Sequence, residues 1–196
     1  RAAADKHYDT MTIAEILAYA KNVIEPMMLV DSHVWIWTTN SMLLEGRPMQ
    51  IAEVMGYRPL TLVTWVKGKV ILEPVGTTDE IVATLSQLLG LRPTKKLWAR
   101  FLQICLDLLR PVLAPAIGMG SYTRGSTEHL MLAIRGKRGR PAPKPAVPNV
   151  FLAPRGRHSA KPVNQYHLVE TVSDGPHAEF FARTRRQGWD AYGNEV

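Results

Sequence analysis

Several polar side chains that could hold a small ligand gather near the C-terminal end of the chain. The stretch from Lys161 to Val196 predicts an amphipathic helix over about 163–172, a short apolar strand at 178–182 and a polar tail. Open α/β sheets bind small ligands beyond the carboxyl ends of their strands. The polar residues that could line one pocket there are Glu179, Arg183, Asn194 and Glu195. On spacing alone, an ordinary helix–strand unit with a solvated arginine cluster is the simpler interpretation, because charges near strand ends are common.

Three short blocks follow one another in this region: residues 158–162 read HSAKP, residues 179–183 read EFFAR and residues 188–195 read GWDAYGNE. They resemble the H-S-x-K-P, E-L-F-A-R and G-W-D-x-W-G-N-E blocks of the MT-A70-like N6-adenine methyltransferases. That family is related to the seventy-kilodalton subunit of mRNA adenosine methyltransferase and also has bacterial and phage members that act on DNA. Three linked blocks in the same order are a specific signal.

The resemblance implies a fold and a cofactor. The fold is α/β, a Rossmann-like class I methyltransferase sheet that is mixed but mostly parallel, with helices on both faces. The cofactor motifs follow the substrate motifs, which is the permuted (β-class) order, and residues 1–196 form a single domain. The implied cofactor is S-adenosyl-L-methionine, which must be held in line with the acceptor nitrogen and away from water.

The family pattern assigns cofactor roles to five residues. Lys161 would meet the carboxylate of the cofactor in a charge-assisted contact. Arg183 and Asn194 would hold its ribose and methionine end, and Glu195 would lie near its adenine or amine. Glu179 would contact the cofactor or orient Arg183.

Further matches predict substrate contacts. Residues 7–11 read HYDTM and resemble a family segment whose tyrosine lies beside the target adenine, although alone they are only a loop before a helix. Residues 118–124 match a G-x-G-x-Y-x-R turn. Trp37 ends a predicted strand and is a better candidate for facing the pocket than Trp35 or Trp65, which are typical of a core. The predicted substrate-binding residues are His7, Tyr8, Thr10, Trp37, Tyr122 and Arg124.

The Asp-Pro-Pro-Trp loop that the family uses for catalysis does not occur in residues 1–196, so no catalytic residue is predicted here. In the family this loop precedes the HYDTM segment, and we expect the strand and loop to lie before Arg1. The alternative is a degenerate, catalytically silent relative that binds nucleic acid and scaffolds an active partner. If the three blocks match by chance, a third interpretation is a nucleotide-binding α/β protein unrelated to methylation.

Charge and composition limit the classes of partner and of site that we expect. The net charge of +7 favours polyanions. Cys105 is the single cysteine, so neither a disulfide framework nor a zinc cage is expected, and no metal site is predicted. No apolar run approaches the ~20 residues of a membrane-spanning helix. We expect a cytoplasmic protein, bacterial or phage-encoded, that does not bind membranes.

A basic segment is the predicted nucleic-acid contact. Between His129 and Val169 there is no acidic residue, while lysines and arginines accumulate over 135–161. The stretch 136–160 is rich in Pro and Gly and should be mostly extended loop. Such a loop can follow a phosphate backbone, although a solvated linker has the same composition. DNA is the expected substrate before RNA, and a homo- or heterodimer is possible.

The remaining elements follow from periodicity and caps. Thr12 and Glu15 form a capping box for a helix over 13–23, and a second helix is expected over 41–55. Strands are predicted at 32–40, 57–67 and 129–135. Residues 68–117 depart from the family and predict an inserted helical hairpin, with helices at 78–89 and 95–109. This insertion is either a target-recognition region or a packing or dimerisation hairpin.

Overall fold

The computed structural model describes residues 10–74, 87, 103, 109–118, 122–137, 146–157 and 160–196. Their contacts divide the chain into two compact units, residues 1–67 with 117–196 (unit 1) and residues 68–116 (unit 2). The predicted substrate residues His7 and Tyr8 lie outside the described residues, as do the predicted insertion helices at 78–89 and 95–109, apart from isolated positions. Within the described ranges, no helix has both the length and the apolar character needed to cross a membrane.

The central sheet of unit 1 is mixed, and its pairing differs from the prediction. The strand β4 (Thr127–Arg135) lies between β1 (Ser32–Thr38) and β2 (Arg58–Pro74) and is antiparallel to both, while β5 (Val150–Ala153) pairs with β2 in parallel. The expectation of a mostly parallel sheet is therefore wrong for these pairs. Antiparallel neighbours need no crossover helix.

One consequence of this order concerns strand direction. Because β4 is antiparallel to both neighbours, β1, β2 and β5 all run the same way. The carboxyl end of β1 and the unit 1 part of β2 therefore lie beside the start of β4, with Thr38 paired to His129 and Trp65 paired to Glu128. The candidate site lies at this edge of the sheet.

One face of the sheet is covered by the N-terminal helices. The helix α1 (Ile13–Tyr19) continues as a π-helix, η1 (Ala20–Ile24), and then as α2 (Glu25–Met27). The predicted capping box of Thr12 and Glu15 is present. Met131 and Ala133 of β4 are buried against these helices and against α4, in a cluster that also includes Ala20, Ile24, Ala52, Met55 and Tyr57.

The predicted helix over 41–55 is divided in two. It forms α3 (Asn40–Leu44) and α4 (Arg47–Val54). Gly46 between them has a φ of 72°, which glycine adopts without a steric penalty. Pro48 lies in the first turn of α4, where proline is favoured because its missing N–H would have no helical partner.

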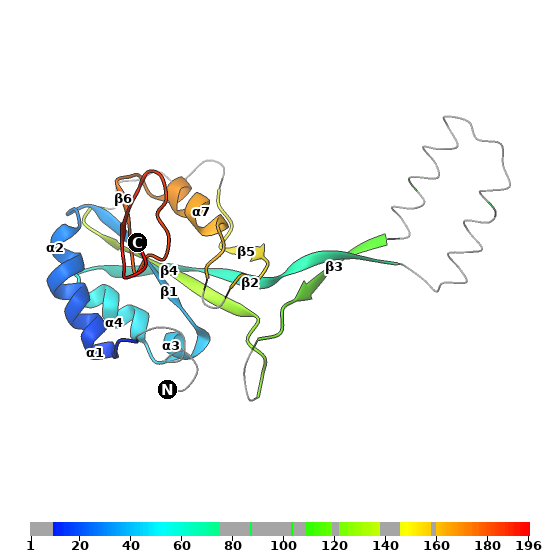
Figure 1. Ribbon diagram of the computed structural model, residues 1–196, viewed down its shortest axis with the longest axis horizontal. Helices are drawn as coiled ribbons and strands as arrows, with labels where there is room; N and C mark the ends of the chain where they lie inside the picture. Colours follow the sequence, from blue (N-terminus) through cyan, green and yellow to red (C-terminus); the bar gives the residue numbers. More distant parts are fainter. Residues whose placement is uncertain are drawn as a thin grey trace. The chain divides into compact units, whose positions relative to one another are not determined.

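The opposite face of the sheet is covered by α7 (Asn164–Val172), close to its predicted position. Leu168 and Val169 of α7 form a buried cluster with Val63 and Leu130. Leu130 and Met131 point to opposite faces because side chains alternate along a strand. Helices on both faces of the sheet were predicted, and this prediction is confirmed (Figure 1).

The C-terminal blocks form a separate two-stranded parallel sheet of β6 (His177–Phe180) and β7 (Trp189–Tyr192). The strand β6 is shorter than the predicted strand at 178–182. Phe181 has a φ of 61°, in the left-handed region, and this ends the extended conformation. The chain beyond it stays attached to β7, because the Ala182 N–H donates to the Tyr192 carbonyl at 3.0 Å.

Unit 2 contains a β-ribbon that the sequence did not predict. Residues 68–74 of β2 pair antiparallel with β3 (Leu109–Pro115). In the described chain β3 has β2 as its partner on one side, so its two prolines sit in an edge strand, where a missing N–H is tolerated. Gly68 is required at its position, because a Cβ there would lie 2.6 Å from the Ala114 carbonyl oxygen.

Candidate functional site

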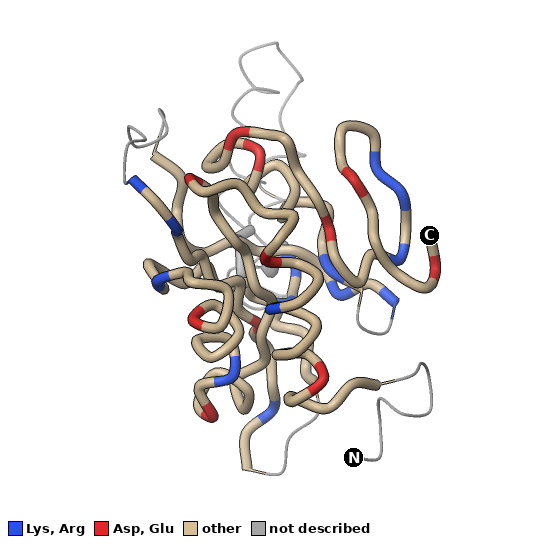
Figure 2. The backbone as a smooth tube through the Cα atoms, turned by 90° about the vertical axis from the view of Figure 1, so that its left-hand side faces the viewer, with Lys and Arg blue, Asp and Glu red and all other residues tan. Residues whose placement is uncertain are grey.

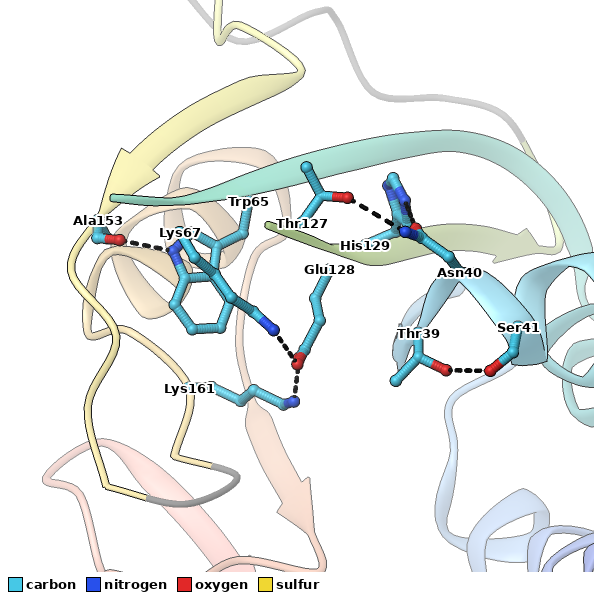
Figure 3. A network of polar contacts seen from close by, with 10 residues as sticks. All are labelled: Thr39, Asn40, Ser41, Trp65, Lys67, Thr127, Glu128, His129, Ala153 and Lys161. Carbon is cyan, nitrogen blue, oxygen red and sulfur yellow. Dashed lines mark hydrogen bonds and ion pairs between the residues drawn. The ribbon is translucent and has the colours of Figure 1, made fainter. Parts of the chain in front are cut away.

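Three charged side chains meet at the carboxyl edge of the sheet. Glu128, the second residue of β4, accepts from Lys67 Nζ at 2.7 Å and is also ion-paired with Lys161. Figure 3 shows the two ammonium groups converging on this carboxylate from β2 and from the segment before α7. The side chains of Lys67 and Glu128 are largely buried, whereas Lys161 is 26% exposed. We call Lys67, Glu128 and Lys161 the charged triad.

Two tryptophan rings support the lysines of the charged triad. Lys67 Nζ lies 5.3 Å from the centre of the Trp65 ring, and Lys161 Nζ lies 5.1 Å from that of Trp37. The two rings make an edge contact at 6.0 Å. Such cation–π contacts are attractive and restrict the position of each ammonium group.

Hydrogen bonds fix both rings. Trp65 Nε1 donates to the Ala153 carbonyl of β5 at 3.0 Å, and Trp37 Nε1 donates to Gln165 Oε1 of α7. Trp65 is buried, as the sequence predicted. Trp37 packs against the Leu168 cluster and supports Lys161, so its direct contact with a substrate stays a prediction.

The charge balance of the triad favours an anionic ligand. Burial raises the pKa of Glu128, but the hydrogen bonds and charges of Lys161 and Lys67 outweigh it and leave that pKa below its usual value. Glu128 is therefore ionised at neutral pH. Two ammonium groups and one carboxylate carry a net charge of +1, and Lys161 is the cation that solvent or a ligand can reach. A ligand carboxylate fits this site by charge.

The first turn of α7 connects the triad to the C-terminal blocks. Gln165 holds Trp37, and the next residue, Tyr166, donates its hydroxyl proton to Glu179 Oε2 at 2.9 Å. Burial, followed by the hydrogen bond to Glu179, raises the pKa of Tyr166 to about 12. Lys161 and Glu179 are thus linked through adjacent residues of one helix turn.

The other predicted cofactor residues gather beyond β6 and β7. Arg183 Nε donates to Glu195 Oε1 at 2.8 Å, and Asn194 is the exposed neighbour of Glu195. Glu179 was expected to contact the cofactor or orient Arg183. In the structure Arg183 is hydrogen-bonded to Glu195, and Glu179 accepts a hydrogen bond from the Tyr166 hydroxyl. Exposed carboxylate, amide and guanidinium groups at this end have the chemistry to bind the hydroxyls and amine of a nucleoside cofactor.

Phe181 is a candidate that the sequence reasoning missed. It follows β6 between Glu179 and Arg183, is 54% exposed and contacts the Tyr19 ring at 5.4 Å. Its left-handed backbone costs on the order of 1–2 kcal/mol for a non-glycine residue, and backbone strain of this kind clusters at functional sites. Its position between two polar residues of the EFFAR block was the available signal.

The predicted substrate residues are only partly placed by the structure. Tyr122 and Arg124 lie exposed in the turn before β4, and this turn adjoins the triad because Lys67 N donates to the Ser126 carbonyl at 2.8 Å. Thr10 is exposed before α1. An exposed aromatic beside an arginine suits contact with bases and phosphates.

A second polar group lies on the other face of β4 and was not expected. His129 Nε2 is 2.7 Å from Asn40 Oδ1 (Figure 3). The His129 Nδ1 atom is 3.1 Å from the Thr64 hydroxyl. An amide oxygen only accepts, so Nε2 carries the proton and Nδ1 accepts from Thr64. Desolvation lowers the pKa of His129, and the charge of Glu128 opposes this more weakly. This histidine is held neutral at pH 7.

The first residue of the predicted nucleic-acid loop, Arg135, has several partners within unit 1. Arg135 donates to Glu25 at 2.9 Å and to the carbonyls of Met28, Leu29 and Met55, and it stacks on Tyr57 at 4.9 Å. It is therefore occupied inside unit 1. The stretch 136–160, expected to be mostly loop, contains β5, and Arg155 and Arg157 are exposed just after this strand.

Acidic and basic residues are interspersed along the described backbone (Figure 2). The loop between β6 and β7 adds a short basic run, Arg183, Arg185 and Arg186. Among the described residues, no cluster of three His, Cys, Asp or Glu side chains could hold a metal ion.

A pocket of about 280 Å³ lies between the sheet and α7, away from these polar groups. It is lined mainly by apolar side chains, and the predicted site residues in the described ranges do not contribute to it. Its lining residues are Trp35, Thr61, Val63, Leu132, Ala146, Val147, Pro148, Asn149, Leu168 and Val172.

Comparison with protein-family models matches residues 109–195 to MT-A70. A search of curated proteins finds no match. The matched stretch runs from β3 to the end of the GWDAYGNE block, and it contains Glu128, Lys161 and Arg183 but not Trp37 or Lys67. A match to this family implies a methyltransferase, and the family generally depends on S-adenosylmethionine. The HSAKP, EFFAR and GWDAYGNE blocks lie within residues 109–195, and the match over these residues supports membership of the MT-A70 family.

Proposed function

We propose that the protein is an S-adenosylmethionine-dependent methyltransferase that methylates the N6 amine of adenine in nucleic acid. The observation that carries the proposal is the charged triad, a net-positive group at the carboxyl edge of the sheet, within a chain that matches MT-A70. We propose DNA rather than RNA as the substrate, because the chain resembles the bacterial and phage members of the family.

The chain's own residues have distinct roles in this proposal. Lys161 binds the carboxylate of the cofactor, and Trp37 restricts Lys161 to one side of the site. Arg183, oriented by Glu195, and Asn194 hold the ribose and the amino acid end. When bound, S-adenosylmethionine supplies a sulfonium methyl group, and transfer to N6 leaves S-adenosylhomocysteine and a proton. These residues bind and orient, which is the larger part of the task in an in-line displacement.

The test measures cofactor binding and methyl transfer separately. Calorimetry with S-adenosylhomocysteine should give binding to the wild type, and Lys161→Ala and Asn194→Ala should each weaken it by roughly tenfold, the size of a lost charge-assisted or buried hydrogen bond. Lys69→Ala removes an exposed lysine outside the site and is the matched control. Unchanged affinity in both site variants would contradict the assignment.

Substrate choice is tested with tritiated S-adenosylmethionine and adenine-containing oligonucleotides. Transfer to double-stranded or single-stranded DNA in excess of transfer to RNA is the expected result. Label in RNA alone would overturn the DNA assignment while leaving the enzyme class intact.

A second candidate function is a catalytically silent nucleic-acid-binding subunit. The exposed pair of Tyr122 and Arg124 and the exposed arginines after β5 favour binding of nucleic acid whether or not transfer occurs. This function predicts affinity that falls steeply with salt, since phosphate contacts release counterions, together with no methyl transfer by the protein alone. If binding does not respond to salt, neither the turn with Tyr122 and Arg124 nor the arginines after β5 contact phosphates.

A further inference from the structure

The charged triad contains one more cation than its carboxylate needs. Lys67 and Lys161 both contact Glu128, and each lies over its own tryptophan. Lys67 is the more deeply placed of the two, with 13% of its side chain exposed against 26% for Lys161. Both cations therefore share one partner, but only one is accessible.

The pairing of both lysines with Glu128 sets the net charge that an approaching anion encounters at Lys161. If Glu128 had Lys161 as its sole partner, the pair would be neutral and a ligand carboxylate would gain little from approaching it. Removing Glu128 would instead leave two ammonium groups side by side on neighbouring segments, where like charges repel. With Lys67 present, the carboxylate is neutralised from the interior and one positive charge remains at the accessible position.

We propose that Lys67 is a positioning residue that neutralises Glu128, so that the charge of Lys161 stays available to the cofactor carboxylate. The proposal rests on the proposed function, because it takes the cofactor to be the carboxylate-bearing ligand. Lys67 does not touch the cofactor in this account. It acts through Glu128, and the family match, which begins at residue 109, does not include it.

The test compares two ligands that differ in one group, S-adenosylhomocysteine and its decarboxylated analogue. The ratio of their dissociation constants, measured by calorimetry on the full chain, isolates the carboxylate contact from the rest of the site. The wild type should prefer the carboxylate form by roughly tenfold. Lys161→Met should abolish the preference, and Lys67→Met should reduce it several-fold although Lys67 is not a ligand contact.

A rescue separates charge balance from simple structural damage. In Lys67→Met/Glu128→Gln the site again carries one positive charge, on Lys161, and the carboxylate preference should return to near the wild-type ratio. Glu128→Gln alone leaves two lysines and should give a ratio at least as large as the wild type. A structural role for Lys67 predicts the opposite, a double variant that is no better than Lys67→Met.

Each outcome has a defined meaning. Lys69→Met is the control for loss of an exposed lysine and should leave the ratio unchanged. Circular dichroism shows whether Lys67→Met folds. If it does not, the test rests on Glu128→Gln: a carboxylate preference below that of the wild type in this variant overturns the proposal. If the wild type binds neither ligand, the proposed function fails. If it binds both and Lys67→Met keeps the full preference, the inference fails while the function stands.

Discussion

Gly193 is the position where a single methyl group should separate the two C-terminal strands. A Cβ at Gly193 would lie 2.2 Å from the Ala182 carbonyl oxygen and 2.8 Å from the Ala182 nitrogen. Both are backbone atoms, so no flexible side chain can move aside. Ala182 is itself buried, and its N–H donates to the Tyr192 carbonyl at 3.0 Å. Gly193→Ala must therefore push the chain after β6 away from the chain after β7.

The expected cost follows from these contacts. Overpacking of a closed site costs about 1–3 kcal/mol, and losing the Ala182 hydrogen bond adds about 1 kcal/mol. We expect Gly193→Ala to lower the free energy of unfolding by about 2–4 kcal/mol on these two grounds. The measurement is urea unfolding followed by tryptophan fluorescence and extrapolated linearly to water. The substitution should also weaken binding of S-adenosylhomocysteine, because it displaces Arg183 and Glu195.

Gly188 provides the matched control five residues earlier. Its φ is 80°, but no atom lies within 4 Å of a Cβ built on it. Gly188→Ala therefore tests left-handed strain without a clash, at a cost of about 1 kcal/mol. If Gly193→Ala costs no more than Gly188→Ala, the close approach of the two strand ends is not what holds this part of the molecule together.

Three further substitutions test individual groups. Thr12→Ala removes the capping box with Glu15 and should lower the free energy of unfolding by about 1 kcal/mol, with unchanged stability in urea contradicting the cap. His129 has a pKa below 6.5, so its contribution is complete above pH 6.5 and is lost as the pH falls through the lower folded value. His129→Gln should flatten the loss of stability below pH 6.5, and an unaltered slope would exclude this histidine as its source. The pKa of Tyr166 is raised from 10.0 to about 12, so its contribution is complete below pH 10 and is lost on going to pH 12. Tyr166→Phe should remove that alkaline loss, and denaturation at pH 9, 10 and 11 would reveal it.

Local signals in the sequence predicted the elements that depend on local interactions. The capping box at Thr12, the strand over 32–40, the strand before Arg135 and the helix over 163–172 are close to their predicted positions. Their caps and hydrophobic periodicity act over a few residues, which is the range that pattern reasoning can detect. The division of the helix predicted over 41–55 could also have been predicted, because Gly46 typically ends a helix and Pro48 typically lies in the first turn of the next.

The missed features depend on contacts between distant segments. Propensity argues against a strand containing two prolines, yet β3 forms because β2 offers it an edge position. The strand β5 lies in a Pro-rich stretch and is specified by its pairing with β2. Lys67 reaches Glu128 across 61 positions of sequence, which no periodic pattern encodes. Cytoplasmic location, dimerisation and nucleic-acid contact by the basic loop stay predictions.

The placement of β4 between β1 and β2 has a consequence for how the chain acquires its structure during synthesis. Ser32 pairs with Arg135, so β1 is synthesised about a hundred residues before its described partner β4. At typical translation rates that interval is several seconds. Throughout it the edge of β1 that β4 occupies is unpaired, and unpaired strand edges favour aggregation. Contacts this distant in sequence also slow folding itself. Production of the protein should therefore benefit from low temperature and from chaperones that shield strands, more than the size of its finished core would suggest.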